Sequence, residues 1–240
     1  MKPPIRKWNG EDRLERVGAS IHNMLANDIE RLRTARPIKE FARVVNRMER
    51  RIPYEVLMAG NRGKPWREAW VALNFGTALK ATHLQMAPTG AQEDFYMKRE
   101  GAWLPYEVTE ALLAGRKRDE EVRASTPEHG EVNFIEHCDI QRESDGALPA
   151  LVKALEKKLR TARGGRLVIY WNTGWLIGAG DFIEGLRLQT APFRDAFAEA
   201  WIMGKASLFR VAPDFMMVQG PPTSLGNSRT KPSVLNELCE

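Results

Sequence analysis

The chain has 240 residues, of which 43% are hydrophobic, and its 36 basic side chains outnumber 31 acidic ones to give a net charge of +5. This length can bury one large core without disulfides, and no apolar stretch approaches the roughly 20 residues of a membrane span. The two cysteines form no disulfide framework and the N-terminus has no apolar signal region, so we expect a cytoplasmic protein. The mild basic excess permits a polyanionic partner without requiring one.

The first 53 residues are expected to form a basic helical region. Apolar residues recur at spacings of three and four, and Pro37 divides the pattern into two helices. Residues 31–51 contain eight basic and two acidic residues, a local charge of +6 that exceeds the charge of the whole chain. Such a surface can contact a phosphate backbone, dock a protein partner, or be an ordinary solvated helix face. The candidate nucleic-acid contacts are Arg43, Arg47, Arg50 and Arg51.

A connector rich in glycine and proline is expected from Tyr54 to Lys64, followed by a helix over residues 65–80. Two apolar stripes lie on nearly opposite sides of this helix, which predicts burial on two faces. Glu68 lies in line with the second stripe and therefore points toward the core. It is either a site carboxylate or an acid placed in the first turn because the helix dipole favours negative charge there.

The stretch from Gln92 to Glu110 most resembles a site. Two runs of aromatic and β-favouring residues flank a polar centre, which predicts a hairpin with Glu100 and Gly101 as its turn. In that register Asp94 lies opposite Glu107, with Cβ atoms roughly 4.5–5.5 Å apart. Two such carboxylates repel each other unless a divalent cation lies between them. The alternative is a solvated hairpin face, and a register shift of one residue would separate the two acids.

The remaining elements follow from hydrophobic periodicity and glycine signals. A short strand is expected over residues 83–87 and a helix over 147–163. Arg166–Trp171 is a continuous apolar run, typical of a strand buried on both faces. Ala200–Met203 and Ser207–Val211 predict a second hairpin.

From Pro65 to Asn172 the expected order is therefore helix, strand, hairpin, helix and buried strand. This order resembles the α-β-β-β-α-β core of the PD-(D/E)XK nuclease-like superfamily, whose sites place an Asp on the second strand, a Glu-x-Lys on the third and often a Glu on the first helix. The matching positions are Glu68, Asp94 and Glu107. The resemblance implies a nuclease in which Mg²⁺ or Mn²⁺ lies between Asp94 and Glu107, with Glu68 as an outer ligand or base.

The chain departs from this family at Thr109, which stands where the pattern has lysine. A neutral hydroxyl cannot supply the field of an ammonium group. Lys98 can replace it, although it lies about 13 Å along the strand from Asp94. Lys117 or Arg118 can fold back over the site, and we include Lys117 among the candidate catalytic residues. The third alternative is that cleavage has been lost.

Two other clusters give weaker signals. Gly174, Gly178 and Gly180 lie between a strand and a helix, but their spacing is neither a dinucleotide fingerprint nor a P-loop, so we expect a mobile loop near the site. Residues 136–139 include a histidine and a cysteine. Adjacent strand residues point to opposite faces, which argues against zinc or a nucleophilic cysteine.

We therefore expect an α/β fold: an α-β-β-β-α-β nuclease-like core with a mixed sheet, an N-terminal helical extension and a C-terminal β-hairpin. The expected divisions are a basic helical region (1–53), a nuclease-like domain (54–219) and a loosely ordered tail (220–240). The expected function is metal-dependent binding or cleavage of nucleic acid phosphodiesters. The alternative is a non-catalytic interaction or structural module on the same fold.

Overall fold

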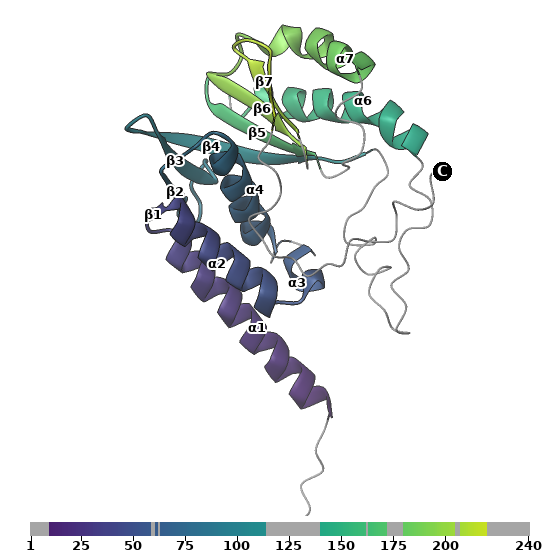
Figure 1. Ribbon diagram of the computed structural model, residues 1–240. Helices are drawn as coiled ribbons and strands as arrows, with labels where there is room; N and C mark the ends of the chain where they lie inside the picture. Colours follow the sequence, from purple (N-terminus) through teal and green to yellow (C-terminus); the bar gives the residue numbers. More distant parts are fainter. Residues whose placement is uncertain are drawn as a thin grey trace, which may run out of the picture.

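The computed structural model describes residues 10–58, 61, 63–113, 140–161, 163–171, 180–204 and 207–219. These residues form a mixed α/β structure with one eight-stranded sheet, which confirms the expected fold class (Figure 1). The helices are α1 (Gly10–Leu32), α2 (Ile38–Arg51), α3 (Tyr54–Met58), α4 (Lys64–Ala78), α6 (Ile140–Leu159), α7 (Gly180–Thr190) and the 3₁₀ helix η1 (Ala191–Phe193). The strands are β1 (Arg36–Pro37), β2 (His83–Met86), β3 (Phe95–Arg99), β4 (Ala102–Ala111), β5 (Arg166–Trp171), β6 (Glu199–Met203), β7 (Ser207–Ala212) and β8 (Met216–Gln219).

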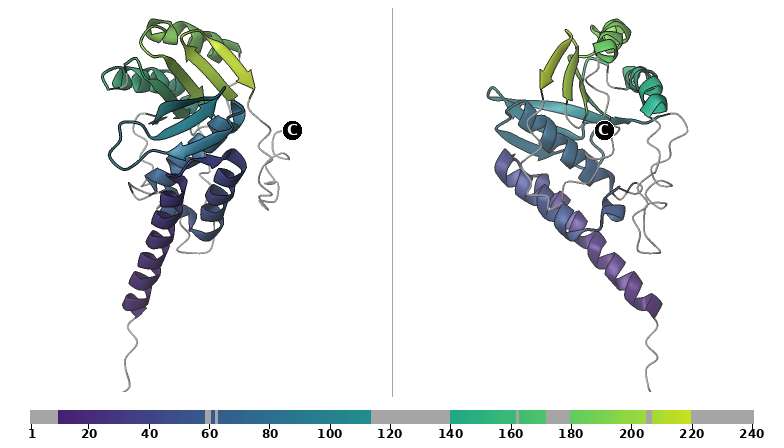
Figure 2. Two further views of the ribbon diagram at one scale, coloured as in Figure 1. Left: turned by 90° about the vertical axis from the view of Figure 1, so that its left-hand side faces the viewer. Right: turned by 45° about the vertical axis from the view of Figure 1, so that its right-hand side comes forward.

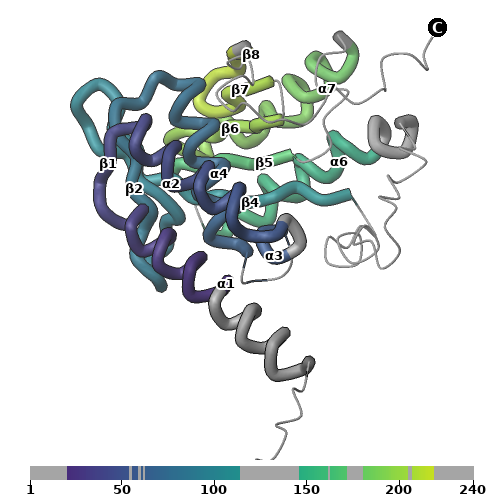
Figure 3. The backbone as a smooth tube through the Cα atoms, turned by 60° about the horizontal axis from the view of Figure 1, so that its bottom comes forward, coloured from purple at the N-terminus to yellow at the C-terminus, as the bar shows by residue number. Residues whose placement is uncertain are grey.

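The strands follow one another across the sheet in chain order, from β1 at one edge to β8 at the other. Neighbours are antiparallel except for β4, β5 and β6, which run parallel. Strand β4 changes partner along its length: it pairs with β3 up to Tyr106 and with β5 from Glu107 onward. We call Tyr106 and Glu107 the branch point of β4. This strand and β5 lie in the middle of the tube drawing (Figure 3).

The hairpin of β3 and β4 has the register that the sequence predicts. Lys98 pairs with Trp103 and Tyr96 with Pro105. Glu100 and Gly101 both have positive φ, at 52° and 86°. Positive φ at both central residues is the signature of the type I′ turn, whose twist suits two-residue hairpins.

Strand β5 lies inside the sheet and is buried on both faces, as its apolar run predicts. It pairs with β4 on one side and β6 on the other. Its residues alternate between two cores, because Val168 belongs to one buried cluster while Leu167 and Ile169 belong to the other. The β6–β7 hairpin is also confirmed.

Helices cover both faces of the sheet (Figure 2). On one face, α1, α2 and α4 enclose a cluster centred on Phe75, whose ring packs edge-on against Tyr106 and Trp201 at centroid distances of 5.2 and 5.5 Å. On the other face, α6 and α7 cover the second cluster. The branch point of β4 therefore lies between α4 and α6.

The N-terminal helices share the core of the sheet. Leu25 and Ile29 of α1 and Phe41 and Val45 of α2 belong to the same buried cluster as Phe75. The apolar core is thus continuous across residue 53, where the sequence suggests a boundary. No helix in the described part of the chain combines the length and apolar character that a membrane crossing needs.

The sequence-based interpretation was wrong at Tyr54–Met58, which forms α3 and not a connector. Arg67 donates to the carbonyls of Leu57 and Met58, at 3.3 and 2.9 Å, and so satisfies the open end of this short helix. Helix α6 begins at Ile140, seven residues before the predicted start. The edge strands β1 and β8 were also missed, because each is short and depends on its single neighbour.

We predict that Gly63→Ala strongly destabilises the fold. A Cβ at Gly63 would lie 2.1 Å from the carbonyl oxygen of Leu57, so α3 and α4 would have to separate. We expect a loss of about 2–3 kcal/mol in the free energy of unfolding, measured by chemical denaturation. Gly101→Ala is the comparison, because that position has open space and only a left-handed backbone; it should lose about 1 kcal/mol. Equal losses at both positions would contradict the close α3–α4 contact.

Candidate functional site at the branch point of β4

Asp94, the residue directly before β3, forms two hydrogen bonds to β4 at the branch point. Its backbone N–H donates to the carbonyl of Tyr106 at 2.9 Å, and its carboxylate Oδ2 accepts from the N–H of Val108 at 2.7 Å. The side chain thus takes the place of a backbone carbonyl where β3 no longer continues the ladder, because a buried N–H needs an acceptor. The Asp94 carboxylate thereby lies against the peptide that joins Glu107 to Val108.

Glu68 of α4 is the second acid of the site. Its side chain is only 13% exposed. Burial and the nearby charge of Asp94 raise the pKa of Glu68 to about 7, and the two carboxyl groups share a hydrogen bond that favours the protonated form. Lys64, one turn earlier, forms an ion pair with Glu68, with its ammonium 3.0 Å from Oε1.

Glu107 contacts a lysine on the opposite helix. Oε1 of Glu107 pairs with the ammonium of Lys158, near the end of α6. Both side chains are largely buried, at 14% and 16% exposure. The second oxygen, Oε2, is buried and has no hydrogen-bond partner within the described chain. A buried acceptor of this kind is available to a ligand.

The expected Asp94–Glu107 pair is not part of the ladder. Regular pairing ends at Phe95 and Tyr106, one step short of it, and the Asp94 N–H is shifted to Tyr106. This shift has the form of a β-bulge, which re-aims a side chain. Asp94 therefore meets Glu68 on the α4 side, while Glu107 meets Lys158 on the α6 side. The three predicted acids gather at one branch point, but not as a face-to-face pair.

The cation of the site was missed in the sequence. Lys158 follows Leu151 by seven residues and Leu155 by three, so it lies on the buried stripe of α6, and this spacing was the available signal. Lys98 lies at the turn end of β3, opposite Trp103, far from Asp94. Lys117 and Arg118 lie outside the described residues, as do residues 136–139, the loop 172–179 and the tail 220–240.

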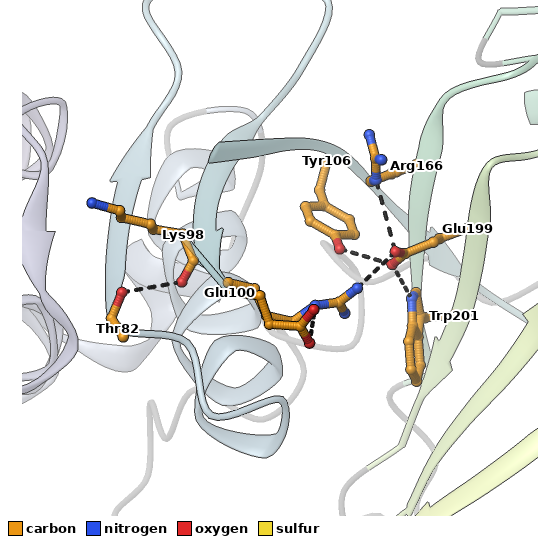
Figure 4. Close-up of polar contacts among 8 residues, drawn as sticks. Thr82, Lys98, Glu100, Tyr106, Arg166, Glu199 and Trp201 are labelled. Carbon is orange, nitrogen blue, oxygen red and sulfur yellow. Dashed lines mark hydrogen bonds and ion pairs between the residues drawn. The ribbon is translucent and has the colours of Figure 1, made fainter. Parts of the chain in front are cut away.

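A second polar cluster surrounds Glu199 at the start of β6 (Figure 4). Its carboxylate accepts from Arg99 at 2.9 Å, Tyr106 at 2.8 Å and Trp201 at 3.0 Å. Burial alone would raise the pKa of Glu199, but these bonds and the Arg99 charge hold it below its usual value. Both carboxylate oxygens of Glu199 have partners, so this cluster fastens the hairpin to β6.

The four predicted nucleic-acid arginines differ in their surroundings. Arg47 is bound to Asp28 of α1 through two hydrogen bonds, at 2.6 and 3.2 Å, and Asp28 is 7% exposed. Arg43, Arg50 and Arg51 are exposed on α2. Arg47 therefore joins α1 to α2, and the other three carry the available charge.

No family model, no curated protein and no solved structure matches the chain.

We predict that Glu68→Gln flattens the dependence of stability on pH. The folded-state pKa of Glu68 is raised from 4.5 to about 7, so its contribution is fully present below pH 4.5 and is lost as the pH rises through 7. Glutamine mimics the protonated acid, and at pH 8 the variant should be more stable than the wild type by up to about 3 kcal/mol. Denaturation at pH 5 and pH 8 measures this. Glu49→Gln, exposed on α2, is the control; a wild type equally stable at both pH values would contradict the account.

We predict opposite roles for Arg47 and Arg43. Arg47→Ala leaves Asp28 buried with a weaker partner and should lower the free energy of unfolding by on the order of 2 kcal/mol, whereas Arg43→Ala should leave stability unchanged.

Joint reversal of Arg43, Arg50 and Arg51 to glutamate should weaken binding of polyanions and flatten its salt dependence. Thermal melts and a salt titration with a fluorescent oligonucleotide measure both effects. Salt-independent behaviour of the wild type would contradict the basic surface as a nucleic-acid contact.

Proposed function

We propose that the chain is a metal-dependent phosphodiesterase of the PD-(D/E)XK nuclease-like type, with its site at the branch point of β4. The observation that carries this proposal is Lys158. The resemblance lacks its lysine at Thr109, and Lys158 brings an ammonium group to Glu107 from α6. We infer that it replaces the missing lysine.

The order of the elements supports the same interpretation. From α4 to β5 the described residues run helix, three strands, helix and strand. Glu68 lies on the first helix, Asp94 directly before the second strand and Glu107 on the third. These are the positions that the resemblance implies for site carboxylates.

The donor set fits a hard divalent cation in its chemistry. Carboxylate oxygens are the preferred ligands of Mg²⁺ and Mn²⁺, and Oε2 of Glu107 is a buried acceptor with no hydrogen-bond partner among the described residues. Within those same residues, no group of three or more His, Cys, Asp or Glu is placed to hold an ion. Mg²⁺ needs only one or two carboxylates, since it keeps several waters. Asp94 and Glu107 would hold it once their carboxylates, which face the α4 and α6 sides of the sheet, turn toward a shared ion, with Glu68 as an outer ligand. When bound, the cation would polarise a phosphodiester and acidify a water.

Three side chains of the site would have separate roles in the reaction. Lys158 is buried and positioned by Glu107, so its charge can stabilise the negative charge that develops on a phosphorus centre. Glu68 lies beside Asp94 and is suited to accept a proton from a water at the site. Lys64 is 59% exposed and can attract the phosphate from solvent.

The second candidate is a non-catalytic module on the same fold, with α1 and α2 docking a protein partner. The observation that favours it is internal pairing. Lys64 already contacts Glu68, Lys158 contacts Glu107, and Asp94 caps Val108. A site neutralised in this way is stable without a ligand. The cytoplasmic location expected from the cysteine content stays a prediction under both functions.

We predict that Mg²⁺ or Mn²⁺ raises the melting temperature and that Asp94→Asn abolishes the rise. An ion that binds only the folded state stabilises it by about 2.7 kcal/mol at 100 times its dissociation constant. The amide oxygen of asparagine can still accept from Val108, so the variant tests the charge and not the fold. A wild type indifferent to both ions at millimolar concentration would leave only the non-catalytic module.

We predict that, of the two neighbouring lysines at the end of α6, only Lys158 is needed for cleavage. Lys158→Gln should reduce cleavage of a labelled oligonucleotide by at least about a hundredfold while keeping the metal-dependent rise in melting temperature. Lys157→Gln is the matched control, because Lys157 is its exposed neighbour. Equal activity of the two variants would contradict the assignment of Lys158.

A further inference from the structure

One face of the β2–β3–β4 sheet carries aromatic residues next to the candidate site. Leu84, Met86, Phe95, Met97 and Tyr106 point into the core under α4. Because side chains alternate along a strand, the intervening residues share the opposite face. They are His83, Gln85, Tyr96, Lys98, Trp103, Pro105 and Glu107. Glu107 of the candidate site therefore lies on this face.

The strand register places these side chains beside one another. Trp103 pairs with Lys98, which pairs in turn with His83, and Tyr96 pairs with Pro105. The rings of His83 and Trp103 meet across β3, with centroids 6.4 Å apart. Tyr96 is the diagonal neighbour of Trp103, at roughly 7–8 Å between Cα atoms. Three aromatic side chains thus form one surface, which we call the aromatic face (His83, Tyr96 and Trp103).

The aromatic face is accessible at its outer end. Trp103 is 40% exposed, which is high for so large an apolar side chain, and Tyr96, Lys98 and His83 are partly exposed. The turn end of the hairpin extends away from α6 and α7 in Figure 1 and in the right-hand view of Figure 2. Lys98 points away from the Glu199 cluster (Figure 4). It pairs with Trp103 on the same side of the sheet, so its charge lies beside the aromatic face.

We propose that the aromatic face binds single-stranded nucleic acid and directs it to the branch point of β4. This inference rests on the proposed function for its direction, but the binding itself does not need the metal. Bases stack on exposed aromatic rings because every base has a π-face, and a lysine between the rings neutralises the backbone. Trp103 and Glu107 are four residues apart on one strand face, or about 13 Å. A single-stranded nucleic acid whose bases stack on Trp103 and Tyr96 therefore reaches Glu107 within a few nucleotides. A duplex cannot use the rings, because its bases are already stacked and paired.

Fluorescence anisotropy of the full-length chain, without divalent cations, tests the proposal. The probes are a fluorescein-labelled oligothymidine, an oligouridine of equal length and a duplex hairpin. We expect Trp103→Ala and Tyr96→Ala each to weaken binding of the single strands about tenfold, and Trp103→Phe to retain it. Lys98→Gln should lower the slope of log affinity against log salt by about one. Met217→Ala, an exposed residue of β8, is the control and should change nothing. The ratio of oligouridine to oligothymidine affinity shows whether the 2′-hydroxyl contributes.

The proposal is overturned if the duplex binds as tightly as the single strands, if the alanine variants bind like the wild type, or if the wild type binds no single strand. These failures differ from a failure of the proposed function. If single-strand binding depends on Trp103 but no cation stabilises the chain, the proposal for the aromatic face is supported and the proposed catalytic function is contradicted. A cation-stabilised chain with no preference for single strands would leave the metal site and remove the aromatic face.

Discussion

Everything at the candidate site depends on the change of partner along β4. A strand in the middle of a sheet must satisfy its backbone N–H and carbonyl groups on both edges. On the β3 side, the backbone partners of β4 end at the branch point. The carboxylate of Asp94 takes the place of the next backbone acceptor, because it accepts a hydrogen bond from the N–H of Val108. Asp94 is therefore held at the branch point because its carboxylate satisfies a backbone N–H group. Together with burial, its charge raises the pKa of the neighbouring Glu68 to about 7.

Buried charge at the branch point is balanced locally. Three acids and two lysines meet there, from α4, β4, α6 and the residue directly before β3. Burying an isolated charge is costly, and partners offset the cost without removing it. The Glu199 cluster shows the contrasting case, in which two arginines, a tyrosine and a tryptophan satisfy one carboxylate. At the branch point, Oε2 of Glu107 is buried without such a partner in the described chain, and Glu68 titrates near neutral pH. These incomplete features set the branch point apart from a structural ion pair.

Much of the fold could be predicted because local signals agreed with tertiary packing. The continuous apolar run of β5, the hairpin turn at Glu100 and Gly101, and the inward position of Glu68 all follow from periodicity and turn chemistry. The site itself was predicted only in part. The three predicted acids do lie together at the branch point, and their role stays a prediction. The bulge at Asp94 directs its side chain away from Glu107, and a one-residue shift of this kind leaves no mark in the sequence. The sequence interpretation placed Lys158 outside the apolar stripe of its helix, because the pattern alone does not distinguish a lysine on the stripe from one beside it. The role of Arg47 depends on Asp28, nineteen residues away on another helix.

The most direct test of the account is a crystal structure grown with millimolar Mn²⁺, with the ion located by its anomalous scattering. The account predicts a peak at the branch point of β4, bound by Asp94 and Glu107, with Lys158 retained beside Glu107. A well-ordered branch point with no peak, or a peak bound only by residues elsewhere on the chain, would contradict the central claim that these carboxylates form a metal site.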